Sequence, residues 1–169
     1  HVDCAEIQDG NEMRLAIREH KGLGGPITLA GHNMKLGRGG IREIEFFTQT
    51  RQLIAGGRDP ELRMRGTREG LDALAGKGWI EPDLAHMLSD HYVAHRTVEH
   101  RLQMVRDAQT HNLPKSANEF DRLAALMDMD RSDLEADLRR RLSAVHEATE
   151  GFFAPDAVAP AVSDALEST

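Results

Sequence analysis

A chain of 169 residues is long enough for about one domain with a single hydrophobic core. Its formal net charge of −7 argues against general nucleic-acid binding, and its single cysteine, Cys4, excludes an internal disulfide framework and a thiolate zinc cage. Aromatic residues make up only 4% of the chain, so aliphatic side chains must fill the core, which favours helices over a β-sandwich.

Apolar periodicity and capping residues predict an all-α bundle of about six helices. The first three are expected over residues 5–21, 40–55 and 67–77. The second should stop at Gly56-Gly57, after which Asp59-Pro60 supplies an N-cap and a first-turn proline.

The longest apolar stripe predicts a helix from Pro82 to about Gln109. Capping-box patterns that begin at Ser116 and Ser132 predict the starts of the last two helices, the second of which reaches about Phe152. The helical domain is thus expected over residues 1–153, with a tail or interdomain linker over residues 154–169.

Residues 27–36 form the one stretch that favours an extended structure. β-branched residues flank a Gly-His-Asn turn, so the segment is either a hairpin or an edge-strand remnant. No apolar run approaches the roughly 18 residues of a membrane span, and no signal peptide opens the chain, so a cytoplasmic location is expected. A first residue other than methionine fits a piece of a longer protein.

The segment Lys35–Phe47 contains a basic, glycine-rich loop directly before a helix. Glycines let backbone amides approach an anion, and a helix N-terminus favours one, so the loop could contact phosphate or an acidic neighbouring domain. The alternative is a tight turn whose glycines adopt positive φ, with solvated basic side chains.

Charged residues then alternate with apolar ones in the first turns of that helix. Arg42 and Glu45 are spaced to pair on one face, and a buried carboxylate needs a partner, which makes Arg42 a candidate partner for Glu43 as well. A structural ion-pair network is favoured over a catalytic role.

Two other groups have spacings that metal sites use. His91, His95 and Glu99 share one helix face, although a packed core or helix-interface role for these histidines is favoured. Asp128 and Asp130 form an Asp-x-Asp pair between helices, where capping and solvation explain them better than metal binding. No metal site and no catalytic nucleophile are therefore predicted.

The segment KLGRGGIREIEFF, from Lys35 to Phe47, resembles a signature of the glutamine synthetase adenylyltransferase/adenylyl-removing enzymes. The similarity extends over roughly residues 7–153, through further blocks in the same order. These blocks are residues 52–60, 67–74, 95–103 and 107–114.

The resemblance implies a helical domain that follows the first of two nucleotidyltransferase units. In that family the corresponding loop after the second unit is less basic, so Arg38 and Arg42 favour the first unit. In that family the first unit removes AMP from glutamine synthetase by phosphorolysis, the second adds AMP from ATP, and both use magnesium. The PII signalling protein and glutamine set the balance, and PII-uridylyltransferases share the helical-domain type.

The family's metal-binding aspartates lie in the preceding catalytic domain, so the resemblance implies no catalytic residue, no cofactor and no activity in this chain alone. The implied partners are glutamine synthetase, PII and the nucleotidyltransferase domains, without nucleic acid or membrane. The signature residues are expected to line the seam with the catalytic domain, with exposed charges satisfied by Arg–Glu pairing and water. They are Lys35, Gly37, Arg38, Gly39, Gly40, Arg42, Glu43 and Glu45. The alternative role is a docking module for PII or glutamine synthetase, outside the active site.

Overall fold

A computed structural model describes residues 27–63, 66–106 and 110–153. Over these residues it contains five α-helices, one 3-10 turn and no strand, which confirms the predicted all-α class. The elements are α2 (Ile41–Gly56), η1 (Pro60–Leu62), α3 (Thr67–Gly76), α4 (Pro82–Arg106), α5 (Ala117–Leu126) and α6 (Arg131–Phe153). The helix expected over residues 5–21, the tail over 154–169 and the last residues expected for the long helix lie outside the described residues.

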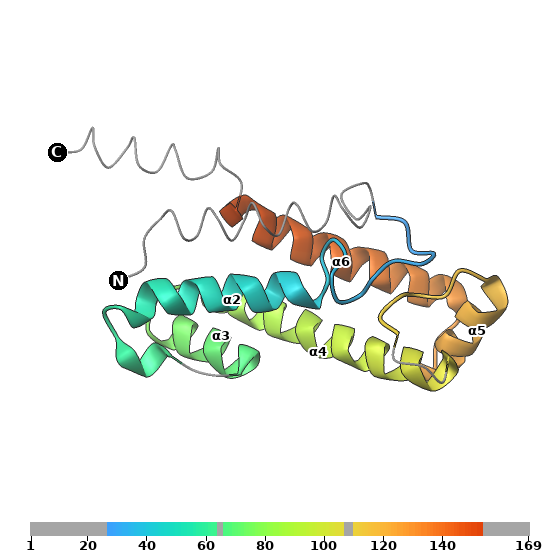
Figure 1. The fold of residues 1–169 in the computed structure, drawn as a ribbon, viewed down its shortest axis with the longest axis horizontal. Coiled ribbons are helices and arrows are strands. Elements are labelled where there is room, and N and C mark those ends of the chain that lie inside the picture. Colours follow the sequence, from blue (N-terminus) through green and yellow to red (C-terminus); the bar gives the residue numbers. More distant parts are fainter. Residues whose placement is uncertain (1–26, 64–65, 107–109, 154–169) are drawn as a thin grey trace.

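Helix α4 runs along one side of the molecule, with α2 and α3 against one end and α5 at the other (Figure 1). Helix α6 packs against α2, α4 and α5 and so closes the bundle. Apolar side chains form two core clusters, one between α4, α5 and α6 and one between α2, α3 and α4. Their largest fully buried members include Met34, Leu102 and Leu123 in the first and Phe47, Leu71 and Leu88 in the second.

The expected caps form at two of the predicted helix starts. The Asp59 side chain accepts a hydrogen bond from the Glu61 amide at 3.1 Å, and the Ser116 side chain accepts one from the Glu119 amide at 3.2 Å. Each cap satisfies an amide that has no partner within its own helix.

The capping pattern predicts that α6 starts after Ser132, and this prediction is wrong because the helix starts before that residue. The helix begins at Arg131, because the Asp130 carbonyl already accepts a hydrogen bond from the Leu134 amide at 3.0 Å. Ser132 therefore lies inside the first turn rather than at the cap.

Residues 27–36 form neither a hairpin nor an edge strand. They make turns and pair with residues 111–113 through a single antiparallel bridge between Asn33 and Asn112. The Met34 amide donates to the His111 carbonyl at 2.8 Å, and the Leu113 amide donates to the His32 carbonyl at 2.8 Å. This pairing fixes the segment against the loop after α4, and it places the following glycine-rich loop beside α4 and α6.

Candidate functional site

The basic loop before α2 is built around the side chain of Asn33. Its Oδ1 accepts hydrogen bonds from the Lys35 amide at 2.9 Å and the Leu36 amide at 2.8 Å, and its carbonyl accepts from the Gly37 amide at 2.8 Å. A short polar side chain that bonds the backbone ahead of it is a usual way to hold a tight turn. The loop therefore has a defined conformation set by its own residues.

The first amides of α2 also have partners within the chain. The amides of Gly40, Ile41 and Arg42 donate to the carbonyls of Gly37, Met34 and Lys35, at 3.0, 2.9 and 2.9 Å. An anion can bind a helix N-terminus only where such amides point at it. These amides are therefore not available to an anion, and the arrangement favours the alternative of a tight turn, in which Gly39 has the positive φ.

Gly39 is the point where the loop meets the rest of the bundle. Its φ is +72°, and a Cβ placed there would overlap the Leu142 carbonyl oxygen of α6. Its amide donates to the Glu43 Oε2 at 2.7 Å, and its carbonyl accepts from the His95 Nε2 at 2.9 Å. Only glycine combines that backbone conformation with so close an approach to α6.

The Glu43 side chain lies in the interior of this arrangement. It is 3% exposed, and its contact with the Gly39 amide resembles the returning half of a capping box. Its Oε1 lies 3.4 Å from the His146 Nδ1, and its Oε2 lies 3.4 Å from the Thr149 hydroxyl. Glu43 thus joins the loop and α2 to α6.

Arg42 does not pair with the buried carboxylate. It contacts Glu45 at 3.7 Å, as the spacing predicts, and its side chain is 58% exposed. Of the signature charges, Arg42 is thus exposed and paired with Glu45, whereas Glu43 is buried and accepts the Gly39 amide.

The remaining signature residues divide by burial. Gly37, Gly39 and Gly40 are buried, whereas Lys35 and Arg38 are half-buried beside the exposed Arg42. The glycines and Glu43 thus build the loop, and Arg42 is its exposed basic side chain, whereas the Nε of Arg38 is buried.

Two histidines of α4, His91 and His95, are buried, and His95 bonds the loop. His95 is fully buried, its ring stacks on that of His91 with centroids 6.5 Å apart, and no described residue gives its Nδ1 a hydrogen-bond partner. Burial lowers the pKa of His95 to about 4, although the hydrogen bond to Gly39 opposes this shift. The ring is therefore neutral, with its proton on Nε2.

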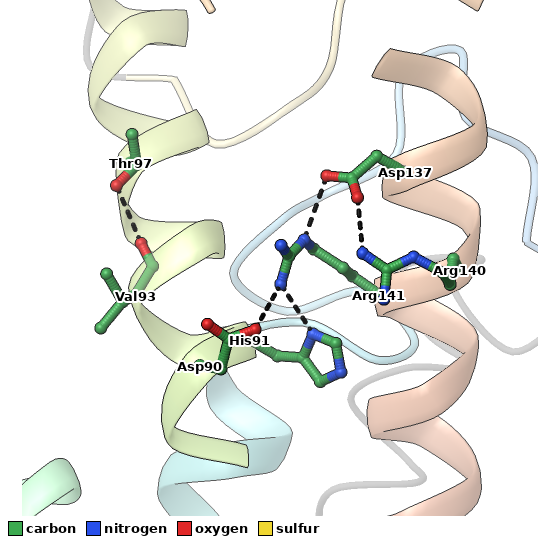
Figure 2. A network of polar contacts seen from close by, with 7 residues as sticks. All are labelled: Asp90, His91, Val93, Thr97, Asp137, Arg140 and Arg141. Carbon is green, nitrogen blue, oxygen red and sulfur yellow. Dashed lines mark hydrogen bonds and ion pairs between the residues drawn. The ribbon is translucent and has the colours of Figure 1, made fainter. Parts of the chain in front are cut away.

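Arg141 of α6 connects this histidine pair to the surface. Its guanidinium donates to Asp90, to Asp137 and to the His91 Nδ1, each at 3.0 Å, and so ties α4 to α6 (Figure 2). Burial, and then the positive charge of Arg141, lower the pKa of His91, whose Nδ1 must be unprotonated to accept this bond. The hydrogen bond from Arg141 lowers the pKa of Asp90.

His91, His95 and Glu99 do not converge on a metal position. Glu99 is buried but turns to His111, whose Nδ1 lies 2.8 Å from its Oε2, and to Arg96 at 3.4 Å. A metal site on these three residues is therefore not supported, and the predicted interface role of the histidines is confirmed.

Asp128 and Asp130 lie in the turn between α5 and α6. Asp128 has φ of 56°, both side chains are exposed, and neither belongs to a group of described residues whose atoms could share a metal ion. Asp130 supplies its carbonyl to the first turn of α6. The helix-terminus interpretation of this pair agrees with the structure.

Sequence reasoning missed the partners that α6 supplies. His146 and Thr149 reach Glu43, and Arg141 reaches His91, across separations of 103, 106 and 50 residues. The spacing of His146 and Glu150 indicates a shared helix face, but nothing local in the sequence indicates that this face meets α2.

Comparison with known proteins gives the family. The family described as GlnD PII-uridylyltransferase matches residues 11–153, which is most of the chain. The chain belongs to the GlnD PII-uridylyltransferase family. This GlnD-family chain is also 48% identical over 165 residues to the bifunctional glutamine synthetase adenylyltransferase/adenylyl-removing enzyme of Xanthobacter autotrophicus. A protein of the same name from Rhizobium meliloti is 52% identical over 127 residues.

These relatives confirm the resemblance seen in the signature, but they are much longer. The match with the Xanthobacter protein covers 97% of the chain and 16% of that protein. The match with the Rhizobium protein covers 75% of the chain and 13% of that protein. The GlnD-family chain thus spans about one-sixth of the length of the curated relatives it matches. Within its described residues, no helix has the length and apolar character needed to cross a membrane.

Proposed function

We propose that this chain is a helical domain of a bifunctional glutamine synthetase adenylyltransferase/adenylyl-removing enzyme, following the first nucleotidyltransferase unit. The names of the relatives and the order of the matching blocks support this assignment. Its role is to position the catalytic domain and substrate and to take part in regulation. The enzyme would remove AMP from glutamine synthetase with phosphate and add it from ATP, with Mg²⁺, in the cytoplasm.

The observation that carries the proposal is the internally bonded signature loop. The amides of residues 35–37 and 39–42 donate to acceptors within the chain, so the loop does not need a ligand to hold its shape. A preformed loop can present a basic side chain without losing conformational entropy on contact. Arg42, the most exposed of the basic signature residues, is therefore offered to a carboxylate or phosphate of the preceding catalytic domain.

The catalytic carboxylates belong to that preceding domain, so this chain alone has no transferase activity. Lys35, Arg38, Arg42 and Glu45 form the outer part of the seam, and Gly37, Gly39, Gly40 and Glu43 support it. PII and glutamine synthetase are partners of the whole enzyme.

Removing the two arginines of the seam should lower deadenylylation by the whole enzyme. We expect Arg38→Ala with Arg42→Ala to reduce kcat/KM by at least about tenfold, which corresponds to about 1.4 kcal/mol of transition-state stabilisation. The melting temperature should change little in Arg42→Ala alone, because Arg42 is exposed and its pairing with Glu45 is an exposed contact of small energy. Arg42→Ala therefore separates the seam role from any loss of stability at the half-buried Arg38.

Arg122→Ala is the matched control, because Arg122 is an exposed arginine on α5, outside the signature loop and its helix. Its deadenylylation rate should equal that of the wild type. Full activity in the Arg38/Arg42 variant would show that the seam role is wrong.

The second candidate function is a docking module for PII or glutamine synthetase. Its support is the set of large apolar side chains that the fold leaves exposed, including Leu53, Val93 and Met104. Calorimetric titration of the 169-residue chain with each protein tests this directly. Heat that disappears in Met104→Ser or Leu53→Ser would favour docking, and no heat with either protein would exclude it.

A further inference from the structure

A histidine and two glutamates from α2 and α6 meet at one point of the bundle. One oxygen each from Glu43 and Glu150 and one ring nitrogen of His146 all lie within 4.8 Å of one another. This is the group among the described residues whose atoms could share a metal ion. His146 and Glu150 lie one helical turn apart on α6, and Glu43 lies in the first turn of α2.

The contacts of His146 are long for histidine–glutamate pairs. The His146 Nδ1 lies 3.4 Å from the Glu43 Oε1 and 3.8 Å from the Glu150 Oε2. By contrast, the His111 Nδ1 lies 2.8 Å from the Glu99 Oε2 in the same molecule. Two ligand atoms on one tetrahedral zinc ion are about 3.3 Å apart, given bonds of about 2.0–2.1 Å. The distance from His146 to Glu43 is thus close to that of two atoms that share a cation, and the distance to Glu150 is longer.

The surroundings of Glu43 are those of a ligating carboxylate. Its side chain is 3% exposed, and its Oε2 accepts the Gly39 amide at 2.7 Å, which orients the group while Oε1 lies toward His146. Outer hydrogen bonds of this kind hold metal-ligating carboxylates in place. His146 is 19% exposed and Glu150 is 37% exposed, so an ion could enter from their side.

We propose that Glu43, His146 and Glu150 form a binding site for a divalent transition-metal ion, with zinc as the best fit. Two carboxylates balance the charge of the ion, and the imidazole favours zinc over magnesium or calcium, which prefer oxygen ligands. Three protein ligands leave at least one coordination position for water or another ligand. The site links the signature helix to α6 and does not depend on the proposed contact with a catalytic domain.

Titration of the metal-stripped 169-residue chain with zinc chloride, followed by calorimetry at pH 7.5, tests the site. One zinc ion should bind per chain, and magnesium chloride under the same conditions should give at least tenfold weaker binding. His146→Gln and Glu150→Gln should each weaken zinc binding by at least tenfold. His111→Gln is the matched control, because it removes a histidine that bonds a buried glutamate directly, and it should keep the wild-type affinity.

Circular dichroism of each variant separates loss of a ligand from loss of the fold. Glu150 is the least buried of the three ligands, so Glu150→Gln decides the result if His146→Gln fails to fold. The proposal is overturned if the wild-type chain binds no zinc, if both substitutions leave zinc binding unchanged, or if magnesium binds as tightly as zinc.

Discussion

Replacing Gly39 with alanine is expected to lower the free energy of unfolding by about 4 kcal/mol. A side chain in this left-handed conformation costs about 1–2 kcal/mol, and the new Cβ would overlap the Leu142 carbonyl of α6. Moving the loop away from α6 would also strain the hydrogen bonds of Gly39 to Glu43 and His95. Overpacking of this kind typically adds about 1–3 kcal/mol. Urea unfolding followed by circular dichroism measures the change.

Gly76→Ala is the matched control for this substitution. Gly76 is the last residue of α3, and no atom lies within 4 Å of where its Cβ would be. We expect a gain of roughly 0.5–1 kcal/mol, because alanine restricts the unfolded chain and favours the helix. If Gly39→Ala stays within about 1 kcal/mol of the wild type, the described contact between the loop and α6 is incorrect.

The wild-type chain is expected to lose about 3 kcal/mol of stability to His95 alone as the pH falls from about 6.5 to 4. Its pKa is about 4 in the folded chain, against 6.5 for an unperturbed histidine, so the unfolded chain takes up the proton first. Above this window both states are neutral and His95 contributes no pH dependence. His91 acts in the same direction, because its pKa is also lowered.

His95→Gln should flatten this dependence, since glutamine can still donate to the Gly39 carbonyl but does not titrate. Urea unfolding at several pH values would show the drop between pH 7 and 4 reduced by about 3 kcal/mol. His100→Gln, an exposed histidine on the same helix, should keep the wild-type slope. An unchanged slope in His95→Gln would mean that His95 is not a buried, neutral histidine in the folded chain.

Local sequence patterns predict most of the helices, because their start and stop signals act within a few residues. The Ser116 cap, the Asp59 cap and the stop at Gly56-Gly57 all lie at element ends in the structure. The error at Ser132 arises because a backbone carbonyl, that of Asp130, closes the first turn of α6 without a side-chain signal. Residues 27–36 form only an isolated bridge at Asn33 and no hairpin, because their partners lie in residues 111–113.

In the candidate site, too, contacts within one helix can be predicted from the sequence, and contacts between distant segments cannot. The pairing of Arg42 with Glu45 is predictable because both lie on one helix face. The burial of Glu43 is not, because it depends on His146 and Thr149 of α6, which the fold brings to α2. The glycine-rich loop resembles an anion site in sequence because a sequence does not show which carbonyls its amides reach.

We have proposed that a catalytic domain covers the outer side of the signature loop in the whole enzyme. Arginine modification by butanedione, read by peptide mass spectrometry, tests it through Arg42, with Arg140 of α6 as the control. Their side chains are 58% and 61% exposed, and each contacts a carboxylate three residues away. Arg42 and Arg140 should react with butanedione at similar rates in the 169-residue chain. In the whole enzyme the reaction of Arg42 should be at least tenfold slower than in the chain, and that of Arg140 should be unchanged. Equal reactivity of Arg42 in the chain and in the whole enzyme would contradict the account.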